Sequence, residues 1–196
     1  MPTIDKKLYD FVVDRVKGYE GCKLTPYWDV DAYSIGYGHH YRPSETPPSQ
    51  ISQDEAERLL AIDMENKIAE ARSIPIFNYL NRARRAALID MVYNMGITKV
   101  NKFKETFEHM QNGEWEDVYK HIMATPYAQQ VPRRATSNAT LFRVGYASGL
   151  EEQPLEPQPE KPDTMVPHGP IPEPPKSKSL FEIILDLILS IFGGKK

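Results

Sequence analysis

The chain has 196 residues, of which 40% are hydrophobic and 26% are charged, and its formal net charge is −3. This length allows one domain with a hydrophobic core plus an appendage, and the composition is ordinary for a globular protein. No basic stripe dominates the sequence, which argues against nucleic acid as a partner.

The first predicted element is a helix that begins after an N-cap at Thr3 and ends close to Glu20, where Gly18 and Gly21 interrupt it. Apolar residues recur in this segment at helical spacing, at Leu8, Phe11, Val12 and Val16. The same segment carries four charges where a signal peptide would have an apolar run, so we expect no signal peptide. Cys22 is the only cysteine, which excludes an intramolecular disulfide.

The next segments change from strand to helix patterns. Residues 24–41 are rich in aromatic and β-branched side chains interrupted by Asp and Gly, which predicts a short hairpin or small sheet. After a proline-containing loop at 42–50, Ser52 and Glu55 form a capping box that opens a helix. Further helices are predicted at 82–95, 103–111, 115–124 and 139–146. The expected fold class is α+β, with a small antiparallel sheet and a mostly helical lobe.

The C-terminal part has a different composition. Nine of the 17 prolines lie between Pro154 and Pro175, so we expect a folded domain at 1–147, a proline-rich linker at 148–179, and an apolar helix with a lysine tail at 180–196. The apolar run at 180–192 would give about 20 Å of helix, short of the ~30 Å hydrocarbon core of a membrane. We therefore expect this helix to lie in a membrane interface or to bind another protein. Folding back on its own domain, or self-association, is the alternative.

Two carboxylates stand out as candidates for catalysis. Glycoside hydrolysis generally uses one carboxyl group that is protonated and one that is ionised. Glu20 is expected at the C-terminal end of a helix, where the helix dipole disfavours negative charge, and Asp29 follows on the adjoining hairpin in a more polar setting. Their spacing alone is weak evidence, because many surface helices end in Glu before a turn that contains Asp.

Several blocks of sequence strengthen this interpretation. They are EGCKLTPYWD at 20–29, SIGYGH at 34–39, DEAE at 54–57, RRAALIDMVYNMG at 84–96, RA at 134–135 and FRVG at 142–145. In this order, over roughly the first 146 residues, they resemble the phage-type lysozymes, the muramidases that many tailed phages carry as endolysins. The resemblance implies a lysozyme-like fold.

The resemblance also implies catalytic roles. Glu20 falls on the general acid, and Asp29 falls on the second carboxylate, which orients water or stabilises the transition state. Ser34 falls where the family usually has a threonine that helps to hold the attacking water. The interval between Asp29 and Ser34 is one residue shorter than usual and Ala32 stands near a familiar turn glycine, so we expect the hairpin tip to close differently.

Other residues are expected to support the site. By resemblance, His39 and Asp63 form a structural ion pair, and Arg134 lies beside the general acid. Candidate substrate-binding residues are Trp28, Tyr37 and Asn94, although core packing is an equal alternative for Trp28. The sequence has no metal-binding motif such as HExxH, and we expect neither a metal nor another cofactor.

The expected function is hydrolysis of the β-1,4 bond between N-acetylmuramic acid and N-acetylglucosamine in bacterial peptidoglycan, with inversion at the anomeric carbon, for phage-mediated degradation of the host wall. The protein would act from the host cytoplasm or the virion on the wall in the periplasm. The apolar segment at 180–192 would attach it to a membrane or to a virion protein. The alternatives are a lytic transglycosylase or chitinase, and a wall-binding or virion structural protein that keeps the fold without catalysis.

Overall fold

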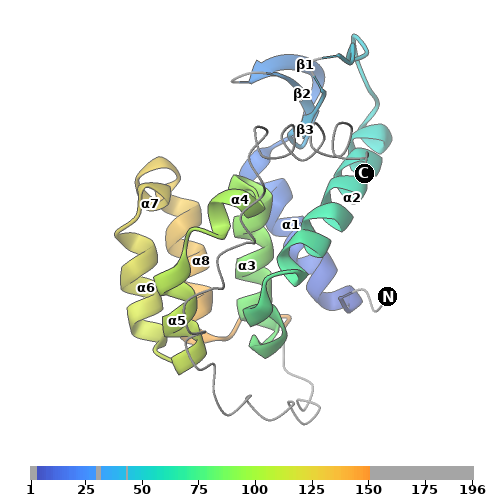
Figure 1. Ribbon diagram of the computed structural model, residues 1–196. Coiled ribbons are helices and arrows are strands. Elements are labelled where there is room, and N and C mark those ends of the chain that lie inside the picture. The colour runs from blue at the N-terminus through green and yellow to red at the C-terminus, as the bar shows by residue number, and fades with distance from the viewer. Residues whose placement is uncertain (1–3, 30–31, 43, 151–196) are drawn as a thin grey trace, which may run out of the picture. The chain divides into compact units, whose positions relative to one another are not determined.

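The computed structural model describes residues 4–29, 32–42 and 44–150 (Figure 1). Within these ranges the fold is α+β, as expected, and its elements in chain order are α1 (Lys6–Glu20), β1 (Lys23–Asp29), β2 (Ala32–Gly36), β3 (His39–His40), α2 (Gln53–Arg72), the 3₁₀ helix η1 (Pro75–Tyr79), α3 (Arg82–Met95), α4 (Ile97–Val100), α5 (Lys104–Asn112), α6 (Trp115–Met123), α7 (Pro126–Gln130) and α8 (Pro132–Val144). The expected C-terminal helix at 180–196, and the expected linker beyond Leu150, lie outside the described residues.

Helix α1 carries the chain to the first candidate catalytic residue. Its N-cap is Asp5, whose side chain accepts a hydrogen bond from the Leu8 amide at 3.2 Å, so the prediction of Thr3 as the cap was wrong. Asp accepts this bond as well as Thr does, and the apolar spacing did not distinguish the two positions. The helix ends at Glu20 because Gly21, with φ of 66°, turns the chain into the sheet.

The three strands form an antiparallel sheet in the order β1–β2–β3, which confirms the predicted small sheet. Tyr27 on β1 lies opposite Ser34 on β2, and Ser34 lies opposite His40 on β3. The sheet packs closely against α2 at Gly36, where an added Cβ would lie 3.4 Å from the Cβ of Ala56. This contact fixes the sheet against one helix.

Helix α2 begins at the predicted capping box but uses only half of it. The Ser52 hydroxyl accepts from the Glu55 amide at 3.1 Å. The Glu55 carboxylate binds the Arg58 guanidinium, at 2.8 Å, instead of reaching back to the cap.

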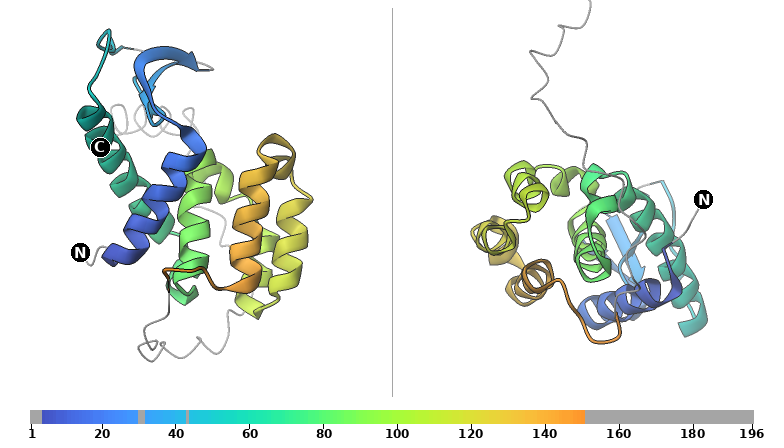
Figure 2. Two further views of the ribbon diagram at one scale, coloured as in Figure 1. Left: turned by 180° about the vertical axis from the view of Figure 1, so that it is seen from behind. Right: turned by 90° about the horizontal axis from the view of Figure 1, so that it is seen from below.

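Helix α3 is the central helix of the fold and has the predicted bounds. Asn81 caps its first turn by accepting from the Arg84 amide at 3.0 Å, and Gly96 ends it. It is buried at Ala83 and along the whole of 86–92, as expected for a helix covered on all sides. It contacts α1, α2 and α8, and the view along the helices shows it between them (Figure 2, right).

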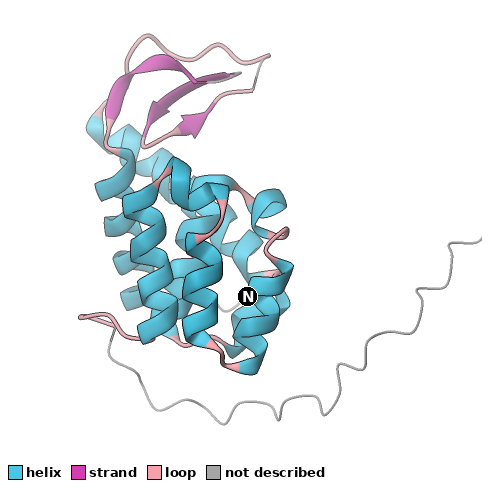
Figure 3. Ribbon diagram, turned by 90° about the vertical axis from the view of Figure 1, so that its left-hand side faces the viewer, coloured by secondary structure: helices cyan, strands magenta, loops and turns pink. Residues whose placement is uncertain are grey.

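The remaining helices complete the helical part. Helices α5 and α6 lie close to their predicted bounds, whereas α8 begins at Pro132 and not at the predicted Ala139. The first turns of α8 bury the polar residues Arg134 and Asn138, so they lack the apolar periodicity on which the prediction depended. The elements η1, α4 and α7 were not predicted. The sheet lies at one end of the packed helices (Figure 3).

The C-terminal end of the described chain belongs to the same core. Leu150 is 2% exposed, so core contacts continue past the expected domain boundary at 147. In the described part of the chain, no helix combines the length and apolar character needed to cross a membrane.

Candidate active site

Glu20 lies where the helices meet the sheet. It is the last residue of α1, and its side chain is 25% exposed. A Cβ added to Gly38, in the turn between β2 and β3, would lie 3.8 Å from Glu20 Oε2. One carboxylate oxygen therefore faces the sheet and is partly open to solvent.

The other oxygen of Glu20 is held by Arg134. The Arg134 Nη1 atom donates to Glu20 Oε1 at 2.5 Å, across 114 residues of sequence. The guanidinium is almost fully buried and lies over the ring of Tyr19, 5.0 Å from its centroid. The structure thus brings together the two residues that the resemblance had paired.

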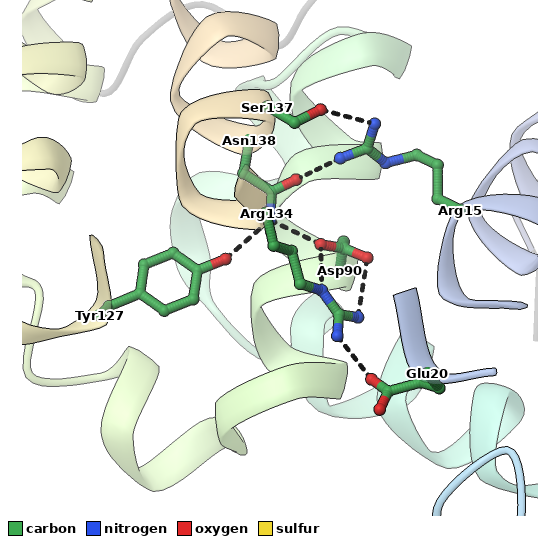
Figure 4. A network of polar contacts seen from close by, with 7 residues as sticks. All are labelled: Arg15, Glu20, Asp90, Tyr127, Arg134, Ser137 and Asn138. Carbon is green, nitrogen blue, oxygen red and sulfur yellow. Dashed lines mark hydrogen bonds and ion pairs between the residues drawn. The ribbon is translucent and has the colours of Figure 1, made fainter. Parts of the chain in front are cut away.

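Arg134 is in turn held by groups that the sequence analysis had not singled out (Figure 4). Its Nε and Nη2 atoms each donate to a different oxygen of Asp90, both at 3.0 Å. Asn138 Nδ2 donates to Asp90 Oδ2 at 2.6 Å and contacts the Tyr127 hydroxyl at 3.0 Å, while Asn138 Oδ1 accepts from Arg15 Nη2 at 2.7 Å. A lone carboxylate in the apolar run of α3 was the signal that could have identified Asp90.

Asp29 lies at the end of β1, opposite Ala32. Side chains alternate along a strand, so Asp29 is on the same face of the sheet as Tyr27, and Ser34 lies opposite Tyr27 on that face. Burial raises the pKa of the Tyr27 phenol, and the negative charges of Asp29 and Glu20 raise it further. Tyr27 therefore lies within electrostatic reach of both candidate catalytic carboxylates.

Ser34 is fully buried beneath this face. Its hydroxyl is 2.9 Å from His40 Nδ1 and is hydrogen-bonded to Tyr27. His40, which the sequence analysis left without a role, is exposed on the same face. The Ser34 hydroxyl thus joins an exposed imidazole to the phenol of Tyr27.

His39 points to the other face, where it contacts α2. Its Nδ1 atom is 2.9 Å from Asp63 Oδ2, and both side chains are about one quarter exposed. The hydrogen bond to Asp63 raises the pKa of His39, although burial opposes part of this effect. The pair connects β3 to the middle of α2.

The three candidate substrate-binding residues are separated. Trp28 precedes Asp29 on β1 and therefore faces the opposite side of the sheet, where it is 62% exposed and packs edge-to-face on Tyr33. It borders a hollow of about 190 Å³ lined by Trp28, Ala32, Tyr33, Tyr41, Arg42, Glu45, Thr46 and Pro47. Tyr37 is buried and accepts from Gln53 Nε2 at 2.9 Å, and Asn94 is half-buried near the end of α3.

Among the described residues, no group of three or more His, Cys, Asp or Glu side chains is arranged to hold a metal ion. The groups that converge on the meeting point of α1 and the sheet are carboxyl, phenol, hydroxyl and guanidinium groups. Such a set can donate a proton, hold a water molecule and stabilise positive charge.

Comparison with known proteins gives relatives of viral and cellular origin. The chain is 30% identical over 160 residues to the pre-baseplate central spike protein Gp5 of Enterobacteria phage T4, a match that covers 68% of this chain and only 28% of the spike protein. It is 26% identical to the probable T4-type lysozyme 2 of Dictyostelium discoideum, covering 67% of this chain and 93% of that protein. It is 32% identical to an endolysin of Lactococcus phage c2, covering 71% of this chain and 62% of the endolysin.

A family model supports the same relationship. The model for phage lysozyme matches residues 17–136, which are more than half of the chain. The match starts before Glu20 and extends past Arg134, so it includes both ends of the ion pair between α1 and α8. The chain belongs to the phage lysozyme family.

Proposed function

We propose that the protein is a muramidase that hydrolyses the β-1,4 bond between N-acetylmuramic acid and N-acetylglucosamine in bacterial peptidoglycan. The observation that carries the proposal is the position of Glu20: a partly exposed carboxyl group at a helix C-terminus, held by a buried arginine and facing a sheet that carries a second carboxylate. Family membership and this pair of carboxyl groups support glycoside hydrolysis by acid/base catalysis.

Glu20 acts as the general acid in this proposal. The exposed side of its carboxyl group donates a proton to the glycosidic oxygen, so that the leaving sugar departs as a neutral alcohol. Arg134 fixes the carboxyl group through its other oxygen and keeps it in one orientation.

Asp29 is the second carboxylate. It stabilises the positive charge that develops at the anomeric carbon and orients the attacking water, which leads to inversion when the water attacks from the far side. Because the Ser34 hydroxyl is covered, its role in this proposal is indirect: it interacts with the Tyr27 phenol, on which the charges of both carboxylates act and which is our candidate to contact that water.

Substrate contacts extend over both faces of the sheet in this proposal. Trp28 and Tyr33 offer aromatic surface to a more distant sugar of the glycan chain, at the hollow beside them. In this proposal the backbone oxygen of Tyr37, bound by the Tyr93 hydroxyl, helps to position the turn beneath the site. The side-chain amide of Asn94, near the end of α3, hydrogen-bonds to the substrate. Peptidoglycan is therefore the expected partner.

The setting of the reaction is also part of the proposal. Similarity to a phage spike protein and to phage endolysins supports action on a host wall, either from the virion or from the host cytoplasm. Detection of the protein in purified phage particles would separate these two routes.

The decisive experiment measures loss of turbidity of bacterial cells stripped of their outer membrane. We expect rapid clearing by the wild-type protein and a rate lower by about 10²–10⁴-fold for Glu20→Gln, because the proton donor is lost while the shape is kept. The matched control is Glu108→Gln, the same change at an exposed glutamate of α5, which should clear at the wild-type rate.

The products distinguish the remaining enzymes. Hydrolysis yields reducing muramic acid ends, whereas a lytic transglycosylase yields anhydro ends and a chitinase also degrades chitin. A folded wild-type protein that binds cell walls without clearing them would overturn the proposal in favour of a binding protein. Equal clearing by wild type and Glu20→Gln would place the general acid elsewhere.

A further inference from the structure

Asp90 is a carboxylate in the hydrophobic core, where a charged side chain is usually unfavourable. It lies in the central helix α3, fully buried, between apolar residues on either side in sequence. Burying a charge is unfavourable unless it is fully paired, and apolar side chains of similar volume stabilise such a position equally well. The structure pairs it fully, through three hydrogen bonds from Arg134 and Asn138.

The two bonds from Arg134 determine which donor remains for Glu20. Nε and Nη2 meet the two oxygens of Asp90 in a bidentate arrangement, which fixes the plane of the guanidinium. The nitrogen left at the other edge, Nη1, then points to Glu20 Oε1 (Figure 4). Asp90, Arg134 and Glu20 thus form two linked ion pairs, which we call the relay. Asp90 is its buried end and Glu20 is its partly exposed end.

The orientation of Asp90 is itself held from α8 and α1. Asn138 donates to Asp90 Oδ2, and its own carbonyl oxygen accepts from Arg15 on α1. Burial raises the pKa of Tyr127, the other neighbour of Asn138, to about 12, so the phenol stays neutral. These contacts leave Asp90 one arrangement in which both oxygens are satisfied.

The charges in the relay are two carboxylates and one cation. Burial lowers the pKa of Arg134, but the hydrogen bonds and charges of Asp90 and Glu20 outweigh burial and raise it, so Arg134 stays charged. An arginine paired with Glu20 alone would favour the ionised carboxylate, which cannot act as an acid. Asp90 supplies the opposite charge from the interior and binds two of the three guanidinium nitrogens, Nε and Nη2.

Other charged groups also lie near Glu20. The charge of Asp29 on β1 acts on Tyr27 together with that of Glu20, the charge of Asp63 on α2 acts on Tyr93 together with that of Glu20, and Arg15 on α1 adds a second cation beyond Asn138. Tyr93 on α3 and Tyr27 on β1 feel the charge of Glu20, but both have raised pKa values, chiefly through burial, and remain neutral phenols. Tyr19 on α1 offers only its ring to Arg134. Among the described residues the ion pairs of Arg134 go to Asp90 and Glu20, so Asp90 is the carboxylate that offsets the arginine charge by direct contact.

We propose that Asp90 is a positioning residue for the general acid: it orients Arg134 and offsets its charge, so that Glu20 can be both held in place and protonated. This inference rests on the proposed role of Glu20 and adds a residue to it. Asp90 touches no substrate and acts only through Arg134.

The test compares pH profiles of clearing for wild type and Asp90→Asn, with Asp117→Asn as the matched control, since that exposed carboxylate on α6 undergoes the same change in charge. We expect the alkaline limb of the Asp90→Asn profile to move to lower pH by about one unit, which corresponds to an approximately tenfold loss on that limb with activity retained at acid pH. The control should keep the wild-type limb. An unmoved limb with a uniformly lower rate would mean a merely structural role and would overturn the inference.

A double variant covers the case in which Asp90→Asn does not fold. Asp90→Asn with Arg134→Gln removes both charges while keeping groups that can hydrogen-bond, so no unpaired charge is buried. Its alkaline limb should lie at or above that of wild type, because the cation is gone, and a limb below that of wild type would contradict the inference.

A second readout does not depend on turnover. Carbon-13 NMR of the glutamate carboxyl groups, with the Glu20 signal identified by its loss in Glu20→Gln, follows the titration directly. We expect the midpoint to fall in Asp90→Asn and stay in Asp117→Asn, and an unchanged midpoint would overturn the inference even in an active enzyme. If the wild type does not clear cells but the midpoint moves, the proposed function fails while the positioning role of Asp90 stands.

Discussion

The hydroxyl of Tyr93, on the central helix α3, donates a hydrogen bond to the backbone oxygen of Tyr37, 3.1 Å away in the turn between β2 and β3. This bond joins the helical part of the protein to the sheet directly beneath the site. In the same turn, a Cβ added to the adjacent Gly38 would lie 3.8 Å from Glu20 Oε2. The position of the sheet relative to the general acid therefore depends partly on Tyr93.

Removing this hydroxyl should weaken the connection without leaving a hole. We expect Tyr93→Phe to lower the free energy of unfolding by about 1 kcal/mol, since a carbonyl loses its partner, and to reduce kcat severalfold because the sheet is held less firmly. Urea unfolding and clearing rates measure the two effects. Tyr119→Phe is the control, because no hydrogen bond of that hydroxyl is found in the described part of the chain. Equal effects of the two changes would refute the role given to Tyr93.

The His39–Asp63 pair predicts a pH-dependent contribution to stability. The hydrogen bond to Asp63 raises the pKa of His39 in the folded state, so the contribution is complete below the unfolded value of about 6.5 and is lost as the pH rises through the folded value. We expect Asp63→Asn to cost about 1–2 kcal/mol at pH 5.5 and clearly less at pH 9.

Urea unfolding at the two pH values measures this difference. Asp117→Asn is the control, because it removes the same carboxylate charge from a pair whose cation is a lysine and not a histidine, so its effect should be the same at both values. A loss for Asp63→Asn that is independent of pH would contradict the ionic character of the pair.

Replacement by alanine at two glycines is expected to change the stability of the fold in opposite directions. Gly36 has a φ of 65° and faces Ala56, so Gly36→Ala should destabilise the fold by about 1–3 kcal/mol through backbone strain and crowding. Gly18 lies in α1 with open space around it, so Gly18→Ala should stabilise the fold by about 0.5–1 kcal/mol. Thermal unfolding of both variants provides the measurement, and a stabilised Gly36→Ala would show that the sheet can move away from α2.

Adjacent residues on β1 should affect different kinetic constants. Asp29→Asn removes the second carboxylate and is expected to lower kcat by about 10²–10³-fold. Trp28→Ala alters the opposite face of the sheet, so we expect a higher KM on intact cell walls with kcat nearly unchanged. Steady-state rates on purified sacculi separate the two, and a comparable fall in kcat for Trp28→Ala would mean that the tryptophan reaches the reacting sugar.

The parts of the fold that were predicted correctly are those with strong local signals. Helix α3 was predicted with its observed bounds, because its apolar residues recur at helical spacing and Gly96 terminates it. The start of α8 was missed because its inward face carries Arg134 and Asn138, whose burial becomes favourable only through contacts with α3. Tertiary pairing of polar groups does not appear as apolar periodicity.

The residues of the candidate site were likewise predicted where a local signal exists and missed where only a tertiary contact identifies them. The positions of Glu20 and Asp29 followed from a helix end and a hairpin, together with the resemblance. Asp90 contacts a residue 44 positions away and was not found. The separation of Trp28 from Asp29 could have been deduced, since neighbours along a strand face opposite sides.

The last described residues end at a distance from the site. Leu150 is buried in the helical core, and Asn81 donates to the backbone oxygen of Gly145 at 2.9 Å, which secures the chain after α8. This segment lies at the end of the helices opposite the sheet (Figures 1 and 2). A fluorescent or affinity module joined directly after residue 150 would thus begin its path away from the catalytic residues, which makes residues 1–150 a sensible unit for transplanting into other polypeptides.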